Sequence, residues 1–207
     1  MYAPKCNQVS DHDILIEAMQ SYSFAILFGP QSDSETSMPL AATHLPLVVK
    51  DSGAHGLLEG HFALANRHWQ ALAGRETLVV FSGPHSYVSP TLYADPLSVP
   101  TWNYIAVHAY GTLDPVEDEP GKEALLFGLI QTHEPAFAEK WRAMSDGFRR
   151  SMLAGIVGFR IPIARIEGKF KISQNRDQAD RRNIHTAHGA GSPDQQALAV
   201  WMTRLGG

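Results

Sequence analysis

The segment Asn103–Leu113 places the tightest constraint on the fold of this chain. Its residues alternate with the period of two of a β-strand, and both sets are largely apolar: Tyr104, Ala106, His108 and Tyr110 against Ile105, Val107 and Ala109. A strand with one face in water carries polar residues at every second position, so this pattern predicts burial on both faces. Such a strand is typical of the inside of a closed barrel, or of a contact between subunits.

The other predicted strands come mostly in sequential pairs with short turns, and the helices stand at the ends and in one insertion. The strands are Ser23–Phe28, Leu40–Lys50, Gly56–Ala63, Thr77–Ser82 and Ile156–Ile172. The helices are Ser10–Gln20, Asn66–Gly74, Lys122–His133, Ala136–Met144, Phe148–Ala154 and Asp194–Leu205, and the tail from Asp177 to the last helix is polar. Parallel βαβ alternation is absent, so the pattern favours an α+β protein built on an antiparallel barrel with flanking helices.

Composition narrows the classes of function. The 207 residues include 17 basic and 21 acidic side chains, whereas a domain that binds nucleic acid through phosphates usually has a basic excess. The single cysteine, Cys6, excludes an intrachain disulfide and a thiolate zinc site. No apolar run reaches the length of a membrane span and the first residues do not resemble a secretory signal, so we expect a cytoplasmic protein.

Polar residues interrupt several strands that otherwise look buried. Thr43, His61 and Asn66 are donors that together predict an anion pocket, strengthened by the free amides of the helix after Asn66. Trp102 and Tyr104 have the shape to stack on a planar ring, although aromatic residues in strands are more often core. The ten histidines are spread over separate elements, so no metal site is predicted. These residues indicate a planar ligand that carries a phosphate.

A longer pattern covers about residues 1–180. Its segments are Met1-Tyr2-x-Pro4-Lys5, Ala42-Thr43-His44-Leu45-Pro46, Gly60-His61-x-Ala63-x-Ala65-Asn66-x-x-Trp69, Gly83-Pro84-His85-x-Tyr87-Val88-Ser89-Pro90-x-x-Tyr93, Val99-Pro100-Thr101-Trp102-Asn103-Tyr104 and Lys169-x-Lys171-x-Ser173-Gln174-Asn175-Arg176. In this order and spacing they resemble the PaiB family, split-barrel proteins that bind flavin mononucleotide (FMN) and are related to pyridoxamine phosphate oxidase. That family is named for a negative transcriptional regulator.

The resemblance implies a homodimer with FMN in two symmetric clefts. Residues 1–180 would be the FMN-binding split-barrel domain, with residues 181–207 a polar segment and helix packed on it. Thr43, His44, Leu45 and Pro46 would run beside the isoalloxazine, and His61, Ala63 and Asn66 would lie near the phosphate. Lys169, Ser173 and Gln174 would close the pocket from the other subunit, and Trp102 and Asn103 complete the expected cofactor-binding residues. The arginine- and lysine-rich phosphate-binding site of the oxidase branch is missing from these motifs.

Three functions stay open at this point. The first is a flavin-linked transcriptional regulator, for which direct DNA binding is doubtful because the chain is net acidic and shows no helix-turn-helix pattern. The second is a flavin-dependent oxidoreductase acting on a small substrate, with His85, Tyr87 or His108 as proton donor and none singled out. The third is a haem-binding split barrel. The catalytic residues, if any, are unknown, and no membrane partner is expected.

Overall fold

The computed structural model describes residues 1–31 and 40–206, and the chain divides into two compact units. The terminal unit comprises Met1–Leu15, Ser82–Val107 and Glu167–Gly207. The central unit comprises Ile16–Phe81 and His108–Ile166. Each unit is described by itself below.

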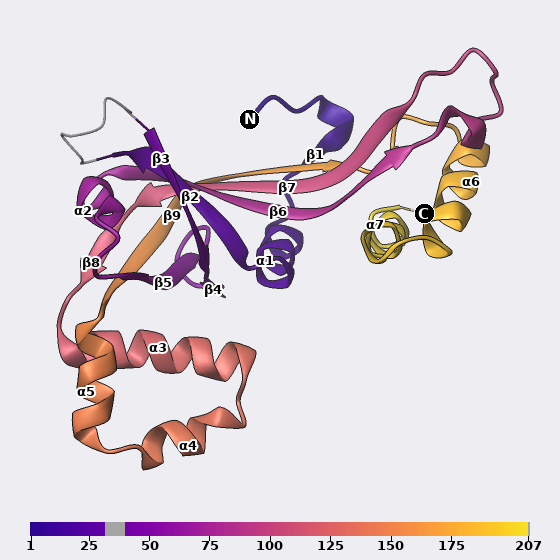
Figure 1. Ribbon diagram of the computed structural model, residues 1–207. Helices are drawn as coiled ribbons and strands as arrows, with labels where there is room; N and C mark the ends of the chain where they lie inside the picture. Colours follow the sequence, from indigo (N-terminus) through magenta and orange to yellow (C-terminus); the bar gives the residue numbers. More distant parts are fainter. Residues whose placement is uncertain (32–39, 207) are drawn as a thin grey trace. The chain divides into compact units, whose positions relative to one another are not determined.

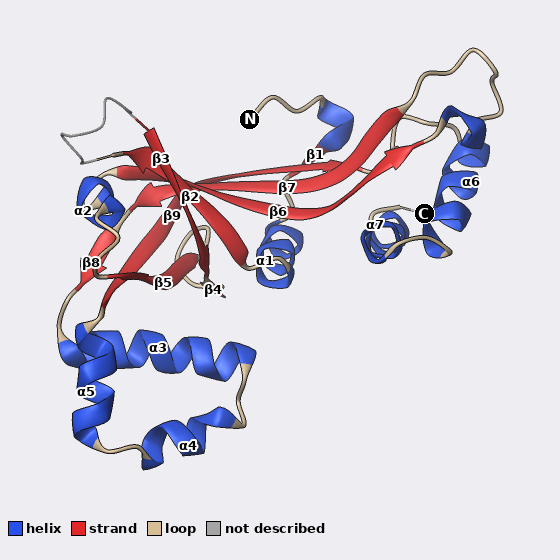
Figure 2. Ribbon diagram, in the orientation of Figure 1, coloured by secondary structure: helices blue, strands red, loops and turns tan. Residues whose placement is uncertain are grey.

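The strands form one antiparallel sheet with open ends. They are β1 (Gln8–Val9), β2 (Phe24–Pro30), β3 (Leu40–Pro46), β4 (Val48–Lys50), β5 (Leu57–Ala63), β6 (Glu76–Val88), β7 (Thr101–Thr112), β8 (Asp114–Val116) and β9 (Ile156–Lys171). Their order is β3-β2-β6-β7-β9-β5-β4, and β1 and β8 also pair with β9. No backbone hydrogen bonds join β3 to β4 in this order, so the barrel is split, as predicted. The long strands β6, β7 and β9 run through both units (Figure 2).

Helices lie between and after the strands (Figure 1). They are α1 (His12–Ser21), α2 (His68–Leu72), α3 (Glu119–His133), α4 (Phe137–Ala143), α5 (Asp146–Ala154), α6 (Gln178–Gly189) and α7 (Pro193–Arg204), with 3₁₀ turns at Lys5–Asn7 and Pro90–Leu92. Asp118, Ser145, Asp177 and Ser192 each accept a backbone N–H at the start of a helix, which satisfies a donor that would otherwise have no partner. Within the described ranges, no helix has both the length and the apolar character needed to cross a membrane.

The register of β5 against β9 decides which side chains enter the core of the central unit. Gly60 is opposite Phe159, and residues directly opposite each other in an antiparallel pair point to the same face. On that face Phe62 and Phe159 are fully buried, with ring centroids 5.1 Å apart. The other face meets α3, because a Cβ placed on Gly158 would lie 2.5 Å from Leu125. The sheet is therefore covered on both sides here.

The alternation predicted for Asn103–Leu113 is present in β7. The odd-numbered residues from Asn103 to Leu113 are buried and the even-numbered ones from Tyr104 to Tyr110 are partly buried. In the terminal unit, the buried face of the sheet packs on α7, where the rings of Phe170 and Trp201 meet edge to face at 5.2 Å.

The largest differences between the predicted elements and the structure lie at two places. Leu40–Lys50 is not one strand: it divides at Leu47 into β3, which pairs with β2, and β4, which pairs with β5. The polar tail after Asp177 contains the helix α6, because Asp177 caps it and Ile184 and His188 are buried on one face. Of its three buried positions, Asp180, Ile184 and His188, only Ile184 is aliphatic, so the sequence pattern did not indicate a helix.

Replacement of Gly111 by alanine should destabilise the protein. A Cβ on Gly111 in β7 would overlap the carbonyl oxygen of Pro162 in β9 and lie 2.7 Å from Ile161 Cγ2. The backbone of β9 cannot move aside as a flexible side chain can. We therefore expect the free energy of unfolding, measured by urea denaturation, to fall by about 1–3 kcal/mol. Gly128→Ala in α3 is the matched control, since its Cβ meets nothing within 4 Å and alanine favours helix. Equal stability of Gly111→Ala and the parent would contradict this account.

Candidate functional site

A cavity of about 360 Å³ lies in the central unit, where β3 approaches the connection between β5 and α2. Its walls are formed by Gln31, Ala41, Ala42 and Thr43 on one side and by Ala65, Asn66, Arg67 and His68 on the other. Two residues predicted to hold a phosphate, Thr43 and Asn66, therefore share one cavity. Because Ala41 and Ala42 carry small side chains, backbone and polar groups remain accessible along this wall.

Three side chains of the cavity form a hydrogen-bonded network. The Thr43 hydroxyl lies 2.8 Å from His68 Nδ1, and Asn66 Nδ2 lies 3.3 Å from Thr43 Oγ1. The backbone N–H of His68 donates to Asn66 Oδ1 at 3.1 Å. Since a backbone N–H is only a donor, it sets the orientation of the Asn66 amide and directs its NH₂ group toward Thr43.

The protonation of His68 decides what Thr43 can do. Burial lowers the pKa of His68, an effect partly offset by the backbone of Gly29, so the ring is neutral at neutral pH. The Thr43 hydroxyl accepts from Asn66 and pairs with Nδ1 of the neutral ring, and the tautomer of that ring sets which of the two donates. Asn66 has a second N–H, and both Asn66 and Arg67, with its guanidinium, line the cavity.

Arg67 and His68 were absent from the residues predicted to bind the cofactor. Their position in the sequence could have indicated them, because these two basic residues directly follow the polar Asn66 at the start of an apolar helix. The sequence pattern predicts a helix that begins at Asn66. In the structure α2 begins at His68 with Arg67 as its N-cap and has only 5 residues, so its free amides do not make an anion site by themselves.

His61 lies away from this cavity. It is opposite Gly158 in the pairing of β5 with β9, and therefore on the face of the sheet that α3 covers. Its Nδ1 is buried without a hydrogen-bond partner in the described ranges, and burial lowers its pKa. Ala63, two residues on, is exposed at the end of the same strand. The structure thus separates His61 from Thr43 and Asn66.

The remaining predicted residues of β3 point to alternating sides. Leu45 is opposite the buried Ala25 and so shares the core face with Thr43. His44 and Pro46 lie on the opposite, exposed face, where the His44 ring is 6.1 Å from that of Phe24.

The other five predicted residues belong to the terminal unit. Asn103 and Ser173 are buried, and Ser173 Oγ donates to Asn103 Oδ1 at 3.1 Å. Gln174 accepts from Ile172 N at 2.8 Å and donates to the carbonyl of Phe170. All three side chains thus take part in hydrogen bonds that hold the end of β9 and the turn after it.

Trp102 and Lys169 lie on the exposed face of the sheet in the terminal unit. Trp102 is 53% exposed, and its ring centroid is 6.2 Å from those of both His85 and Tyr87. The Lys169 ammonium donates to Tyr2 O at 3.0 Å and lies over the ring of Tyr104 at 5.3 Å. These aromatic residues form an accessible platform with a cation beside it.

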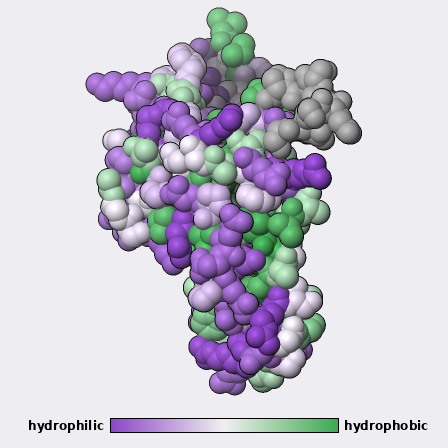
Figure 3. Space-filling model, turned by 90° about the vertical axis from the view of Figure 1, so that its left-hand side faces the viewer, coloured by the Kyte–Doolittle hydropathy of each residue, from purple (hydrophilic) through white to green (hydrophobic). Residues whose placement is uncertain are grey.

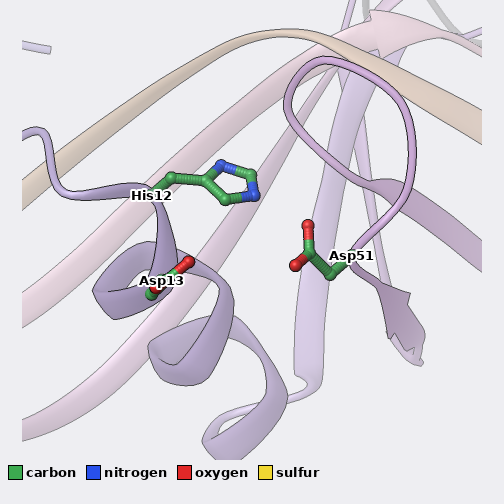
Figure 4. A group of neighbouring side chains, drawn as sticks. All are labelled: His12, Asp13 and Asp51. Atoms are coloured by element: carbon green, nitrogen blue, oxygen red, sulfur yellow. The ribbon is translucent and has the colours of Figure 1, made fainter.

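One group of potential metal ligands, His12, Asp13 and Asp51, is drawn in Figure 4. His12 and Asp13 begin α1 in the terminal unit, and Asp51 follows β4 in the central unit. Exposed acidic groups are common without an ion, and the three residues are divided between the units, so we assign no metal site to them.

Comparison with known proteins identifies the family. Residues 1–165 match the family model described as "Putative FMN-binding domain". The chain belongs to this FMN-binding family. FMN is accordingly its cofactor, as predicted from the sequence.

Two relatives support the membership. The Bacillus subtilis (strain 168) protein named "Protease synthase and sporulation protein PAI 2" is 36% identical over 187 residues, which cover 89% of this chain and 87% of the relative. This match confirms the resemblance to the PaiB family. An uncharacterized protein of Emericella nidulans is 30% identical over 185 residues, 70% of this chain and 73% of its own length.

A solved structure supports the fold. The flavocytochrome Anf3 from Azotobacter vinelandii superposes with a TM-score of 0.61 at 15% identity, over 88% of this chain and 82% of that one. The likeness confirms the predicted split-barrel architecture with flanking helices.

Acidification should destabilise the protein partly through His68. Its pKa is lowered in the folded protein, so as the pH falls the unfolded chain takes up this proton first. The stabilisation is complete above the ordinary histidine pKa of about 6.5 and is lost as the pH falls toward the lower value of the folded state. Urea unfolding at pH 7.5 and 5.5 should therefore show a smaller loss of stability in His68→Gln than in the parent.

The exposed His133 at the end of α3 provides the control His133→Gln. Equal losses of stability in the parent and in His68→Gln would contradict the role given to the buried ring.

Proposed function

We propose that the cavity between β3 and the β5–α2 connection holds the phosphate end of FMN. The observation that carries the proposal is the meeting of Thr43, Asn66, Arg67 and His68 around one space of about 360 Å³. The donor set fits a phosphate, because an amide N–H and a guanidinium both donate to phosphate oxygens, and the guanidinium adds a positive charge. Arg67 supplies the cation that the sequence motifs lacked.

The residues of the cavity orient the cofactor rather than react with it. Bound FMN supplies the electron chemistry. Asn66 is held by the backbone of His68 and by Thr43, so its free N–H has a fixed direction before the ligand arrives. A donor that is already oriented loses little entropy on binding, which favours affinity.

The exposed face of β2 and β3 favours a homodimer. Pairing of Pro30 with Leu40 places Leu40 on the same face as Phe28 and Phe24. These three residues are 71%, 37% and 64% exposed. On one face of the molecule, separate apolar areas interrupt a largely hydrophilic surface (Figure 3). Contiguous apolar residues on a sheet mark a surface that another protein covers, and a second copy of this chain is the occupant we propose.

The role proposed for the flavin-loaded dimer is regulatory, without direct contact with DNA. PAI 2, whose name refers to protease synthesis and sporulation, supports a regulatory setting for its relative here. α6 and α7 are joined by a short turn, but the exposed residues of α7 include Asp194, Gln196 and Val200. A recognition helix presents donors and cations to DNA, so α7 is poorly suited to that task.

FMN titration of two variants tests the cavity. Asn66→Ala removes one ligand hydrogen bond and should weaken FMN binding by about 1–2 kcal/mol, or roughly 5- to 30-fold. His61→Ala is the matched control, because His61 lies on the face covered by α3 and should leave the affinity unchanged. Unchanged affinity in a cooperatively folded Asn66→Ala would move the phosphate elsewhere, and a loss in His61→Ala equal to that in Asn66→Ala would extend the site to β5.

Light scattering tests the dimer. The parent should show twice the mass of one chain at micromolar concentration, and Phe24→Glu should shift the mass toward that of one chain by adding a charge to the apolar face. Phe148→Glu, at a 48% exposed residue of α5, should leave the dimer intact. A parent with the mass of a single chain would refute the proposal.

DNA binding tests the regulatory route. With a formal net charge of −4, the protein should bind duplex DNA weakly at physiological salt in an electrophoretic mobility-shift assay. Nanomolar binding to a defined operator, with a steep dependence on salt, would show that regulation proceeds by direct contact.

A further inference from the structure

A second pocket lies between α6 and α7 in the terminal unit, beyond residue 165 where the match to the FMN-binding family model ends. Its volume is about 460 Å³. α6 contributes Gln178, Arg181, Arg182 and His185, and α7 with the residues after it contributes Met202, Thr203 and Gly206. The two helices lie side by side at the C-terminal end of the chain (Figure 1).

The charged residues that line this pocket are all basic. Arg181 and Arg182 carry positive charge, and the lining residues that the structure describes include no aspartate or glutamate. Two arginines of the central unit, by contrast, are neutralised: Arg149 pairs with Glu123 and Asp146, and Arg160 pairs with Glu59. Unneutralised arginines facing one space favour an anion, most of all in a chain with an acidic balance.

The hydrogen bonds of the pocket leave donors free. Arg181 donates one amino group to the carbonyl of Gly206, while its Nε is buried without a partner in the described part of the chain. Arg182 is exposed and forms no ion pair or hydrogen bond with the described residues. A buried N–H without an acceptor costs free energy, which a ligand oxygen would recover.

The other lining groups set the shape of the ligand. His185 Nε2 lies 2.9 Å from Thr203 Oγ1, which ties the imidazole of α6 to α7. Met202 is almost fully buried and gives the pocket an apolar surface near the basic residues. A ligand that satisfies both parts has an anionic end and an apolar body.

We propose that the pocket between α6 and α7 binds a small organic phosphate, with the phosphate on Arg181 and Arg182 and the organic part on Met202. A phosphate monoester carries close to two negative charges at neutral pH and matches two guanidinium groups, whereas a carboxylate carries one. This pocket is distinct from the cavity of the central unit, since the two share no residue. It is therefore a site separate from the cavity proposed for the flavin phosphate.

Calorimetric titration of phenyl phosphate into the FMN-loaded protein tests the proposal, because the flavin site is then already filled. The parent should bind phenyl phosphate, and Arg182→Gln should weaken this binding at least tenfold. Arg150→Gln is the matched control, since Arg150 is an exposed arginine of α5 outside this pocket. Arg182 is exposed, so its replacement should leave the melting temperature and FMN content unchanged.

Two further probes sharpen the result. Inorganic phosphate lacks the apolar body and benzoate lacks the second charge, so both should bind more weakly than phenyl phosphate. Absence of phenyl phosphate binding at millimolar concentration, equal affinity in Arg182→Gln and parent, or benzoate binding as tightly as phenyl phosphate would overturn the proposal. These outcomes leave the assignment of the FMN cavity untouched, since every titration uses flavin-loaded protein.

Discussion

The backbone hydrogen bonds of β9 are the interaction on which the rest of this structure depends. This strand of 16 residues, Ile156–Lys171, pairs with β1, β5, β7 and β8. A buried backbone group without a partner costs free energy, so a strand at this position must keep its pairing throughout. Pro162, which has no N–H to donate, lies opposite Leu57, the first residue of β5. β9 accommodates a proline there because the ladder to β5 begins at that residue.

β9 also determines which residues surround the candidate site, although none of its own residues lines the cavity. Its pairing with β5 turns His61 toward α3 and buries Phe62 in the core, where the Phe62 ring meets that of His68 edge to face at 6.3 Å. His68 is thereby held in an apolar setting that lowers its pKa. A neutral His68 is hydrogen-bonded to the Thr43 hydroxyl, and Asn66 and Arg67 line the same cavity. Packing in the core thus determines which donors the cavity offers.

Charge is distributed unevenly between the described parts of the chain. In the central unit, Glu59 is almost fully buried between Lys50 and Arg160, so its charge is compensated by two partners. In the terminal unit, Arg176 lies over the ring of Tyr93, whereas Arg181 and Arg182 face a pocket with no aspartate or glutamate among its described lining residues. Net charge alone would not have indicated an anion site in this chain, because binding depends on the local arrangement of charges.

The sequence by itself determined the fold class, the family and the cofactor. The alternation in Asn103–Leu113 and the sequential strand pairs are local patterns. Such patterns can be recognised without knowing which distant segments of the chain pack against them. The motif around Asn66 lies at the cavity that the structure shows. Tertiary structure decided how the side chains of each motif are used. A strand that shifts its register by one residue moves every side chain to the other face, so the separation of His61 from Thr43 followed only from the pairing of β5 with β9.

The other differences between the sequence predictions and the structure arise from contacts between residues that are far apart in the chain. Asn103 and Ser173 are 70 residues apart and meet only because their strands are brought together, which turned two predicted cofactor residues into a buried hydrogen-bonded pair. α6 is helical because Ile184 and His188 find a core to enter, although its sequence is mostly polar. The formation of a helix with so narrow an apolar face depends on tertiary packing, since propensity alone is too weak to hold 12 residues in place.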